Sequence, residues 1–138
     1  MARYALLLFG LAWGGFGLLG LFAPDAILGA AGISFDASAG ITEARTMYGG
    51  SQLGLALFFF WAAGRPAYHV PGLVVGGLYM GGAALARAFG VFVVGATDFT
   101  SVSAMVMEFG ATGIALISLW QLGVFAGGSG FAGRGEGS

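Results

Sequence analysis

The sequence predicts an all-α protein, an integral membrane four-helix bundle in which the helices run up, down, up and down. Only 8% of the 138 residues are charged, 58% are hydrophobic, and the mean hydropathy is +0.92. A soluble domain usually carries about 25% charged residues, so this chain lacks the charge to cover a surface in water. Four apolar stretches each reach the ~20 residues that cross a bilayer, and short connections predict antiparallel neighbours.

The first predicted span runs from about Tyr4 to Phe22 and ends at Pro24. Arg3 precedes it, so a cleaved signal peptide is the alternative interpretation. The apolar run is longer than the roughly 7–15 residues of a signal sequence's hydrophobic region. Three further apolar stretches come after it, and we therefore interpret it as a retained membrane helix.

The second predicted span runs from about Thr42 to Ala63, with Thr42 as the N-cap and Glu43 in the first turn. The third runs from about Val70 to Gly95, and the fourth from about Ser101 to Phe125. Together the four spans define one domain over residues 1–126. Residues 127–138 are rich in Gly and Ser and are predicted to form a flexible tail.

Charges outside the spans predict the orientation in the membrane. One set of connections and ends holds Arg3, Arg65, His69 and Arg134, and the other set holds Asp25, Asp36 and Asp98. Arg and Lys concentrate on the cytoplasmic side of membrane proteins. We therefore expect both termini in the cytoplasm, and we expect the protein in the inner membrane of a bacterium.

Four ionisable residues fall within or at the ends of the predicted spans, namely Glu43, Arg45, Arg87 and Glu108. At 1.5 Å per residue, all four lie in the outer half of the bilayer. A charge at the bilayer centre costs at least about 2.5–3.5 kcal/mol, so such residues usually face the bundle interior and pair. We expect Arg87 to pair with Glu108, with Arg45 and Glu43 in the same cluster.

Simpler interpretations remain for each charge. Glu43 would be only a first-turn partner of the helix dipole, Arg45 would extend to the lipid headgroups, and Arg87 with Glu108 would be a structural clamp. Tyr48 and Gln52 share the helical face of Arg45 at spacings of three and seven residues, and they complete the candidate site. Glu43 lies almost opposite Arg45 on an α-helix.

Small residues at four-residue spacing predict close helix packing. The candidate packing glycines are Gly49, Gly50, Gly54, Gly77 and Gly81. Glycine lets two helix backbones approach closely within a membrane. Packing within one chain and packing between copies both fit this pattern.

The segment 43–50 (EARTMYGG), followed by Arg87 and Glu108, resembles the bacterial membrane family catalogued as domain-of-unknown-function family 4345. Its members are similar in having four predicted spans, an E-x-R-x-x-Y-G-G motif at the start of the second, a late Arg in the third and a Glu in the fourth. The resemblance covers about Pro24 to Trp120. It implies the four-helix fold and brings no activity.

Several chemistries are not expected. The chain has no Cys and a single His, and it lacks the motifs of a phosphate loop, a zinc site or a catalytic triad. We expect no enzyme activity, cofactor, metal or nucleic-acid partner. An accessory subunit of a larger membrane complex, or a homo-oligomer, fits best. The alternative is a protein that binds or transports a lipid or another hydrophobic molecule, with its head group at Arg45 and Arg87 and its tail near Trp13 and Phe92.

Overall fold

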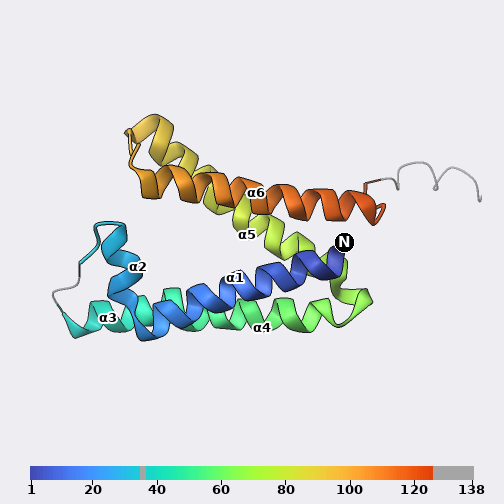
Figure 1. The fold of residues 1–138 in the computed structure, drawn as a ribbon, viewed down its shortest axis with the longest axis horizontal. Coiled ribbons are helices and arrows are strands. Elements are labelled where there is room, and N and C mark those ends of the chain that lie inside the picture. Colours follow the sequence, from blue (N-terminus) through green and yellow to red (C-terminus); the bar gives the residue numbers. More distant parts are fainter. Residues whose placement is uncertain (35–36, 126–138) are drawn as a thin grey trace, which may run out of the picture.

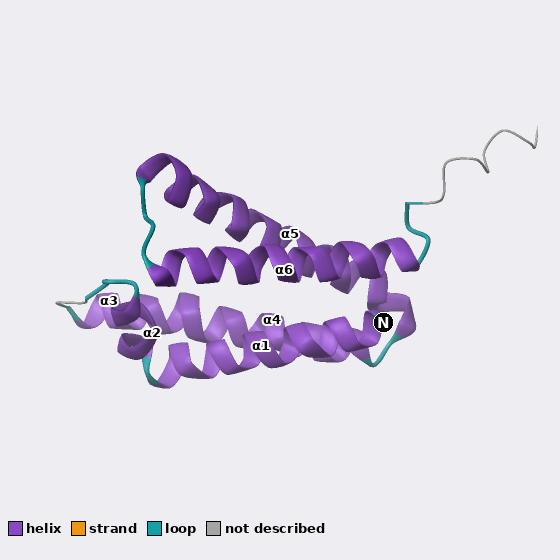
Figure 2. Cartoon of the chain, turned by 45° about the horizontal axis from the view of Figure 1, so that its top comes forward, coloured by secondary structure: helices purple, strands orange, loops and turns teal. Residues whose placement is uncertain are grey.

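The computed structural model describes residues 1–34 and 37–125. Within these ranges all secondary-structure elements are helices, joined by loops and turns, and there is no strand (Figure 2). In chain order the elements are α1 (Ala2–Phe22), α2 (Pro24–Ala30), α3 (Ser38–Ala44), η1 (Arg45–Gly50), α4 (Ser51–Ala63), η2 (Pro66–Tyr68), α5 (His69–Phe89), η3 (Gly90–Val94) and α6 (Phe99–Gln121). η1 and η3 are π-helical turns and η2 is a 3₁₀ turn. The predicted all-α class is confirmed. The predicted tail at 127–138 lies outside the described residues.

The long helices form two antiparallel pairs. α1 lies along α4, and α5 lies along α6 (Figure 1). The two pairs meet near the N-terminus of α1 and diverge toward the opposite end, where α2 and α3 lie. Long helices joined by short turns pack as antiparallel neighbours, which explains the pairing of α5 with α6.

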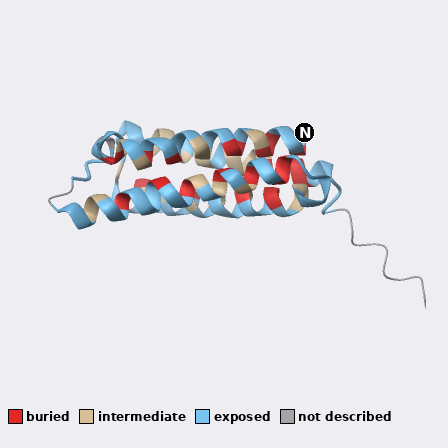
Figure 3. Ribbon diagram, turned by 90° about the horizontal axis from the view of Figure 1, so that it is seen from below, coloured by how far each residue is buried: buried red, intermediate tan, exposed pale blue. Residues whose placement is uncertain are grey.

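The hydrophobic core lies at the end where the pairs meet. Buried residues are concentrated there, close to the N-terminus (Figure 3). The core residues are Ala2, Ala5, Leu6, Phe9, Phe59, Ala62, Ala63, Leu73, Ala115 and Leu119. Phe9 and Phe59 interlock as tilted rings with centroids 5.5 Å apart, and Trp13 packs against both. Trp13 is therefore part of the aromatic packing between helices.

The continuous helical rod formed by α3, η1 and α4 starts earlier than the second predicted span. Helix α3 begins at Ser38 rather than Thr42, and α3, η1 and α4 succeed one another without a break to Ala63. The predicted N-cap at Thr42 is wrong, because its hydroxyl donates to the Ser38 carbonyl one turn back, at 2.9 Å. A Ser or Thr inside a helix commonly bonds the carbonyl at i−4 in this way. The helix end at Ala63 agrees with the prediction.

The last helix ends earlier than predicted, at Gln121 instead of Phe125. Gly123 adopts a left-handed conformation with φ of 73°, and the Val124 amide then donates to the Leu119 carbonyl at 3.2 Å. Glycine adopts this conformation without the steric cost that a Cβ would bring, and a left-handed glycine is a common end of an α-helix. The connection predicted after Phe22 also contains the short helix α2, with Pro24 at its first position.

Three glycines on α1 and η1 hold these two elements in direct backbone contact. A methyl group at Gly49 would lie 2.9 Å from the Leu21 Cα, and one at Gly17 would lie 2.9 Å from the Leu53 nitrogen. A methyl group at Gly20 would overlap the Tyr48 carbonyl. No side chain fits in this crossing, so glycine is required at each of the three positions.

The predicted packing glycines divide into two groups. Gly49, Gly77 and Gly81 lie at helix contacts, where an added Cβ would meet Leu21, Ala115 and Thr112. Gly50 and Gly54 have open space around them, so they take no part in packing between the helices of this chain. The glycine-x-x-x-glycine spacing alone does not say which way each residue faces.

Three helices are long and apolar enough to cross a membrane: Ala2–Phe22, Pro66–Val94 and Phe99–Gln121. The rod from Ser38 to Ala63 is not among them. Its first half carries Glu43 and Arg45, and Gln52 lies in the second half, which lowers the hydropathy of this segment. These polar residues belong to the candidate site that the sequence predicts.

Asp98 forms the N-cap of α6. Its carboxylate accepts hydrogen bonds from the Ser101 hydroxyl at 2.7 Å and from the Ser101 amide at 2.9 Å. The bond from the Ser101 hydroxyl has the larger effect and the bond from the Ser101 amide the smaller, and both lower the pKa of Asp98 below its ordinary value. Negative charge at a helix N-terminus is favourable as well.

This cap predicts a pH-dependent stability. Because the pKa of Asp98 is lower in the folded than in the unfolded chain, its contribution is present above about pH 4 and is lost as the pH falls through the folded pKa. Thermal unfolding in non-ionic detergent should therefore show a fall in midpoint below pH 4. Asp98→Asn keeps an acceptor for the Ser101 amide but does not titrate, so its midpoint should fall less. Equal slopes for the two proteins would contradict this role.

Candidate functional site

Arg87 and Glu108 form the ion pair that the sequence predicts. The Arg87 Nε donates to one carboxylate oxygen of Glu108 at 2.9 Å, and an Nη donates to the other at 2.8 Å. This two-pronged geometry joins α5 to α6 in the half where the helix pairs diverge. Fork-to-fork pairs are among the strongest charge-assisted hydrogen bonds. The Thr112 hydroxyl donates to the Glu108 carbonyl at 2.8 Å, one turn further along α6.

Arg45 and Glu43 do not join this pair, so the predicted single cluster of four charges is wrong. Both side chains are exposed, and the part of the chain that the structure describes contains no ion pair to either. Arg45 and Glu43 lie on the α3–η1–α4 rod, whereas Arg87 and Glu108 lie on the other helix pair. Because the two helix pairs diverge at this end, the two sets of charges lie apart in space (Figure 1).

The π-helical turn η1 changes which residues share a face. A π turn closes hydrogen bonds from residue i to i+5, and it rotates the next helical segment relative to its place in a continuous α-helix. In an α-helix Arg45 would share a face with Tyr48 and Gln52. In the structure, Glu43 instead lies with Tyr48 and Gln52 on the face that borders a pocket, and Arg45 is not among the lining residues.

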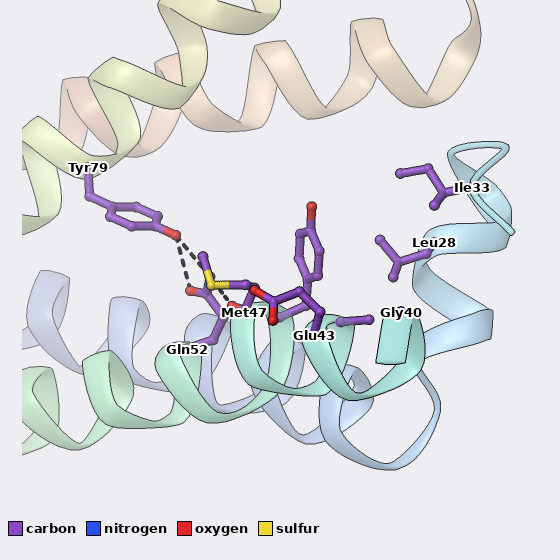
Figure 4. Close-up of a pocket in the computed structure, with 9 residues that line it drawn as sticks. Leu28, Ile33, Gly40, Glu43, Met47, Gln52 and Tyr79 are labelled. Atoms are coloured by element: carbon purple, nitrogen blue, oxygen red, sulfur yellow. Dashed lines mark hydrogen bonds between the residues drawn. The ribbon is translucent and has the colours of Figure 1, made fainter. Parts of the chain in front are cut away.

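The pocket has a volume of about 420 Å³ and lies between the α3–η1–α4 rod, α2 and α5 (Figure 4). Its lining residues are Leu28, Ile33, Gly40, Glu43, Ala44, Met47, Tyr48, Gln52 and Tyr79. Small-molecule sites commonly have volumes of about 300–1,000 Å³ and a mostly apolar lining with a few polar groups. In Figure 4, Leu28 and Ile33 come from one side, and Gln52 and Tyr79 close the other.

One hydrogen bond closes the inner wall of the pocket. The Gln52 amide nitrogen donates to the Tyr79 hydroxyl oxygen at 2.9 Å and is also 3.3 Å from the Met47 carbonyl. Gln52 is buried, and Tyr79 packs edge-on against Trp13 with centroids 5.7 Å apart. Through Tyr79, the pocket wall thus contacts the aromatic residues of the core.

Sequence reasoning missed the lining residues Tyr79, Met47, Leu28 and Ile33. Leu28 belongs to the connection between the first two predicted spans, and Ile33 lies just after α2. Tyr79 places a hydroxyl group in the middle of an apolar span, and that was the available signal, because a phenol within a membrane span needs a hydrogen-bond partner. Phe92, assigned to a ligand tail, is instead 77% exposed and borders no part of this pocket.

A family model described as Domain of unknown function (DUF4345) matches residues 1–121, which is most of the chain. The chain belongs to this family. The predicted resemblance is confirmed, and the match extends beyond the predicted Pro24–Trp120 to include all of α1. No curated protein and no solved structure matches the chain.

In this DUF4345 member, the E-x-R-x-x-Y-G-G segment serves both packing and the pocket. Gly49 lies against the α1 backbone, while Glu43 and Tyr48 border the pocket. Tyr48 also packs edge-on against Phe16 of α1, with centroids 6.5 Å apart. Among the described residues no group of three or more His, Cys, Asp or Glu side chains could hold a metal ion.

Proposed function

We propose that this DUF4345 protein is a non-enzymatic, multi-pass membrane protein whose four helical rods all cross the bilayer, up, down, up and down. Three rods have the required length and hydropathy, and the fourth, Ser38–Ala63, packs along α1 through its η1 and α4 segments. Large apolar side chains are exposed on every long helix, as expected of surfaces that face lipid. Glu43 and Gln52 of the fourth rod border a pocket, where a membrane protein tolerates polar groups.

The distribution of charge supports a cytoplasmic N-terminus in a bacterial inner membrane. Arg3 and Arg65 lie at the end where the helix pairs meet, and Asp25 and Asp98 lie at the opposite end. The guanidinium of Arg65 lies 4.7 Å from the Trp61 ring, which in turn contacts Tyr68. Aromatic and basic residues together are typical of the cytoplasmic interface. Arg134 and Asp36 lie outside the described residues.

Within this framework, the protein binds a hydrophobic small molecule, such as a single-chain lipid, in the pocket. The observation that carries this proposal is the pocket itself. It has a suitable volume, its walls are mostly apolar, and its polar side chains are few, namely Glu43, Tyr48 and the hydrogen-bonded pair Gln52 and Tyr79. The pocket lies in the diverging half of the molecule, so a ligand enters without disturbing the core at the other end.

Met47→Trp tests this binding. Met47 borders the pocket, is 52% exposed and tolerates a larger ring without entering the core, so a Trp should fill the pocket and leave the fold intact. Native mass spectrometry with 1-monolauroylglycerol, a neutral single-chain lipid, should show saturable one-to-one binding to the wild type and at least tenfold weaker binding to the variant.

The matched control is Leu57→Trp. Leu57 is 69% exposed on α4 and borders no part of the pocket. This variant should bind as the wild type does. Non-saturable binding to all three proteins would mean that the lipid merely coats the apolar surface, and it would contradict the proposal.

An accessory subunit of a larger membrane complex is the second candidate, and one observation favours it. The Arg87 side chain is 37% exposed although it is paired with Glu108, which is 12% exposed. A charged side chain facing lipid is costly, and a partner helix would cover it. Sizing after gentle solubilisation from native membranes should then show a stoichiometric heteromer, whereas a monomer would argue against this candidate.

A further inference from the structure

Among the described residues that line the pocket, one carries a negative charge and none carries a positive charge. Glu43 supplies the carboxylate. Arg45 comes two residues later in the chain but lies outside the lining. The Nε and one Nη of Arg87 both donate hydrogen bonds to Glu108. An anionic head group, such as one placed at Arg45 and Arg87 in the alternative interpretation of the sequence, would therefore meet a carboxylate of the same charge.

The other polar groups of the pocket are largely occupied. Gln52 and Tyr79 bond each other, and the Gln52 amide also reaches the Met47 carbonyl. Glu43 has no ion-pair partner in the part of the chain described, and it is an exposed residue of the pocket lining. Leu28, Met47 and Ile33 supply apolar walls around it. The carboxylate thus marks where a ligand's polar end would be held, with the apolar body against these walls.

We infer that the ligand is a hydrophobic molecule with a protonated amine, held by the Glu43 carboxylate in the pocket lining. This inference rests on the proposed binding function and names its ligand class. An ammonium donating to a carboxylate gives a charge-assisted bond, which is about twice as strong as a neutral one. An amine-bearing phospholipid and a free alkylamine share this chemistry.

The test compares three single-chain probes of equal length in dodecylmaltoside: dodecylamine, dodecanoate and dodecanol. Competition with bound 1-monolauroylglycerol, measured by native mass spectrometry, gives their relative affinities. Dodecylamine should bind the wild type at least tenfold more tightly than dodecanoate. A further arm with lysophosphatidylethanolamine separates the two sources, because a phospholipid ligand should outcompete the free amine.

Two variants locate the charge that matters. Glu43→Gln keeps the size of the side chain and removes its charge, so it should abolish the preference for dodecylamine over dodecanoate. Arg45→Gln is the matched control and should retain the preference. Tighter binding of dodecanoate that is lost in Arg45→Gln would overturn the amine assignment while leaving the pocket as a binding site. Failure of every probe to displace monolauroylglycerol, together with non-saturable binding of that lipid, would overturn the proposed function itself.

Discussion

Replacing Arg87 with Met should lower the free energy of unfolding by about 3 kcal/mol, because the Glu108 carboxylate would remain without its partner in a low-dielectric setting. Glu108→Leu should have a similar cost for the converse reason. The double variant should recover to within about 1 kcal/mol of the wild type, since apolar residues often replace a buried ion pair without loss. Equilibrium unfolding by SDS titration in dodecylmaltoside, monitored by tryptophan fluorescence, measures all three.

Arg45→Met is the control for the loss of a positive charge. Arg45 is exposed and has no ion pair in the described ranges, so the change should cost less than about 0.5 kcal/mol. Additive losses in the double variant, equal to the sum of the single ones, would show that the two residues do not act as a pair.

Substituting Gly20 with Ala should destabilise the protein by about 3 kcal/mol or more. The new methyl group would overlap the Tyr48 carbonyl, and a backbone atom within two packed helices cannot move aside as a flexible side chain does. Inserting a methylene into a well-packed core typically costs about 1–3 kcal/mol, and a clash with backbone belongs at the upper end. The same SDS titration measures the effect.

Gly15 provides the matched control on the same helix. A methyl group there would meet nothing within 4 Å. Gly15→Ala should therefore be neutral or stabilising, because Ala favours a helix over Gly by up to about 1 kcal/mol. Similar losses in both variants would mean that α1 does not cross η1 as closely as the structure shows.

The pairing of Arg87 with Glu108 was predictable from sequence because charges inside apolar helices are rare and must find partners. The positions of Glu43 and Arg45 were not predictable from periodicity. The π turn over Arg45–Gly50 alters the helical phase, and the sequence does not reveal it. It lies where Gly49 contacts the α1 backbone, which is a property of tertiary packing rather than of local preference.

The pocket was beyond sequence reasoning for a related reason. Its walls come from three separate parts of the chain, namely the α2 region, the α3–η1–α4 rod and α5, and the first of these lies in the connection between the first two predicted spans. Tyr79 lies 27 residues from its hydrogen-bond partner Gln52, so no local spacing joins them. The helix lengths, by contrast, depend directly on hydropathy, and they agree with the prediction except where Thr42 and Gly123 shift an end.

The pocket beside η1, rather than the apolar surface at large, is the proposed place of the ligand. Photolabelling with a diazirine-bearing dodecylamine, combined with peptide mapping, tests this placement most directly. We predict that labels concentrate on residues 40–52 and on the peptide containing Tyr79, and that excess unlabelled dodecylamine removes them. Labels spread equally over exposed side chains outside the pocket, such as Leu57 and Phe92, and resistant to competition, would contradict the proposal.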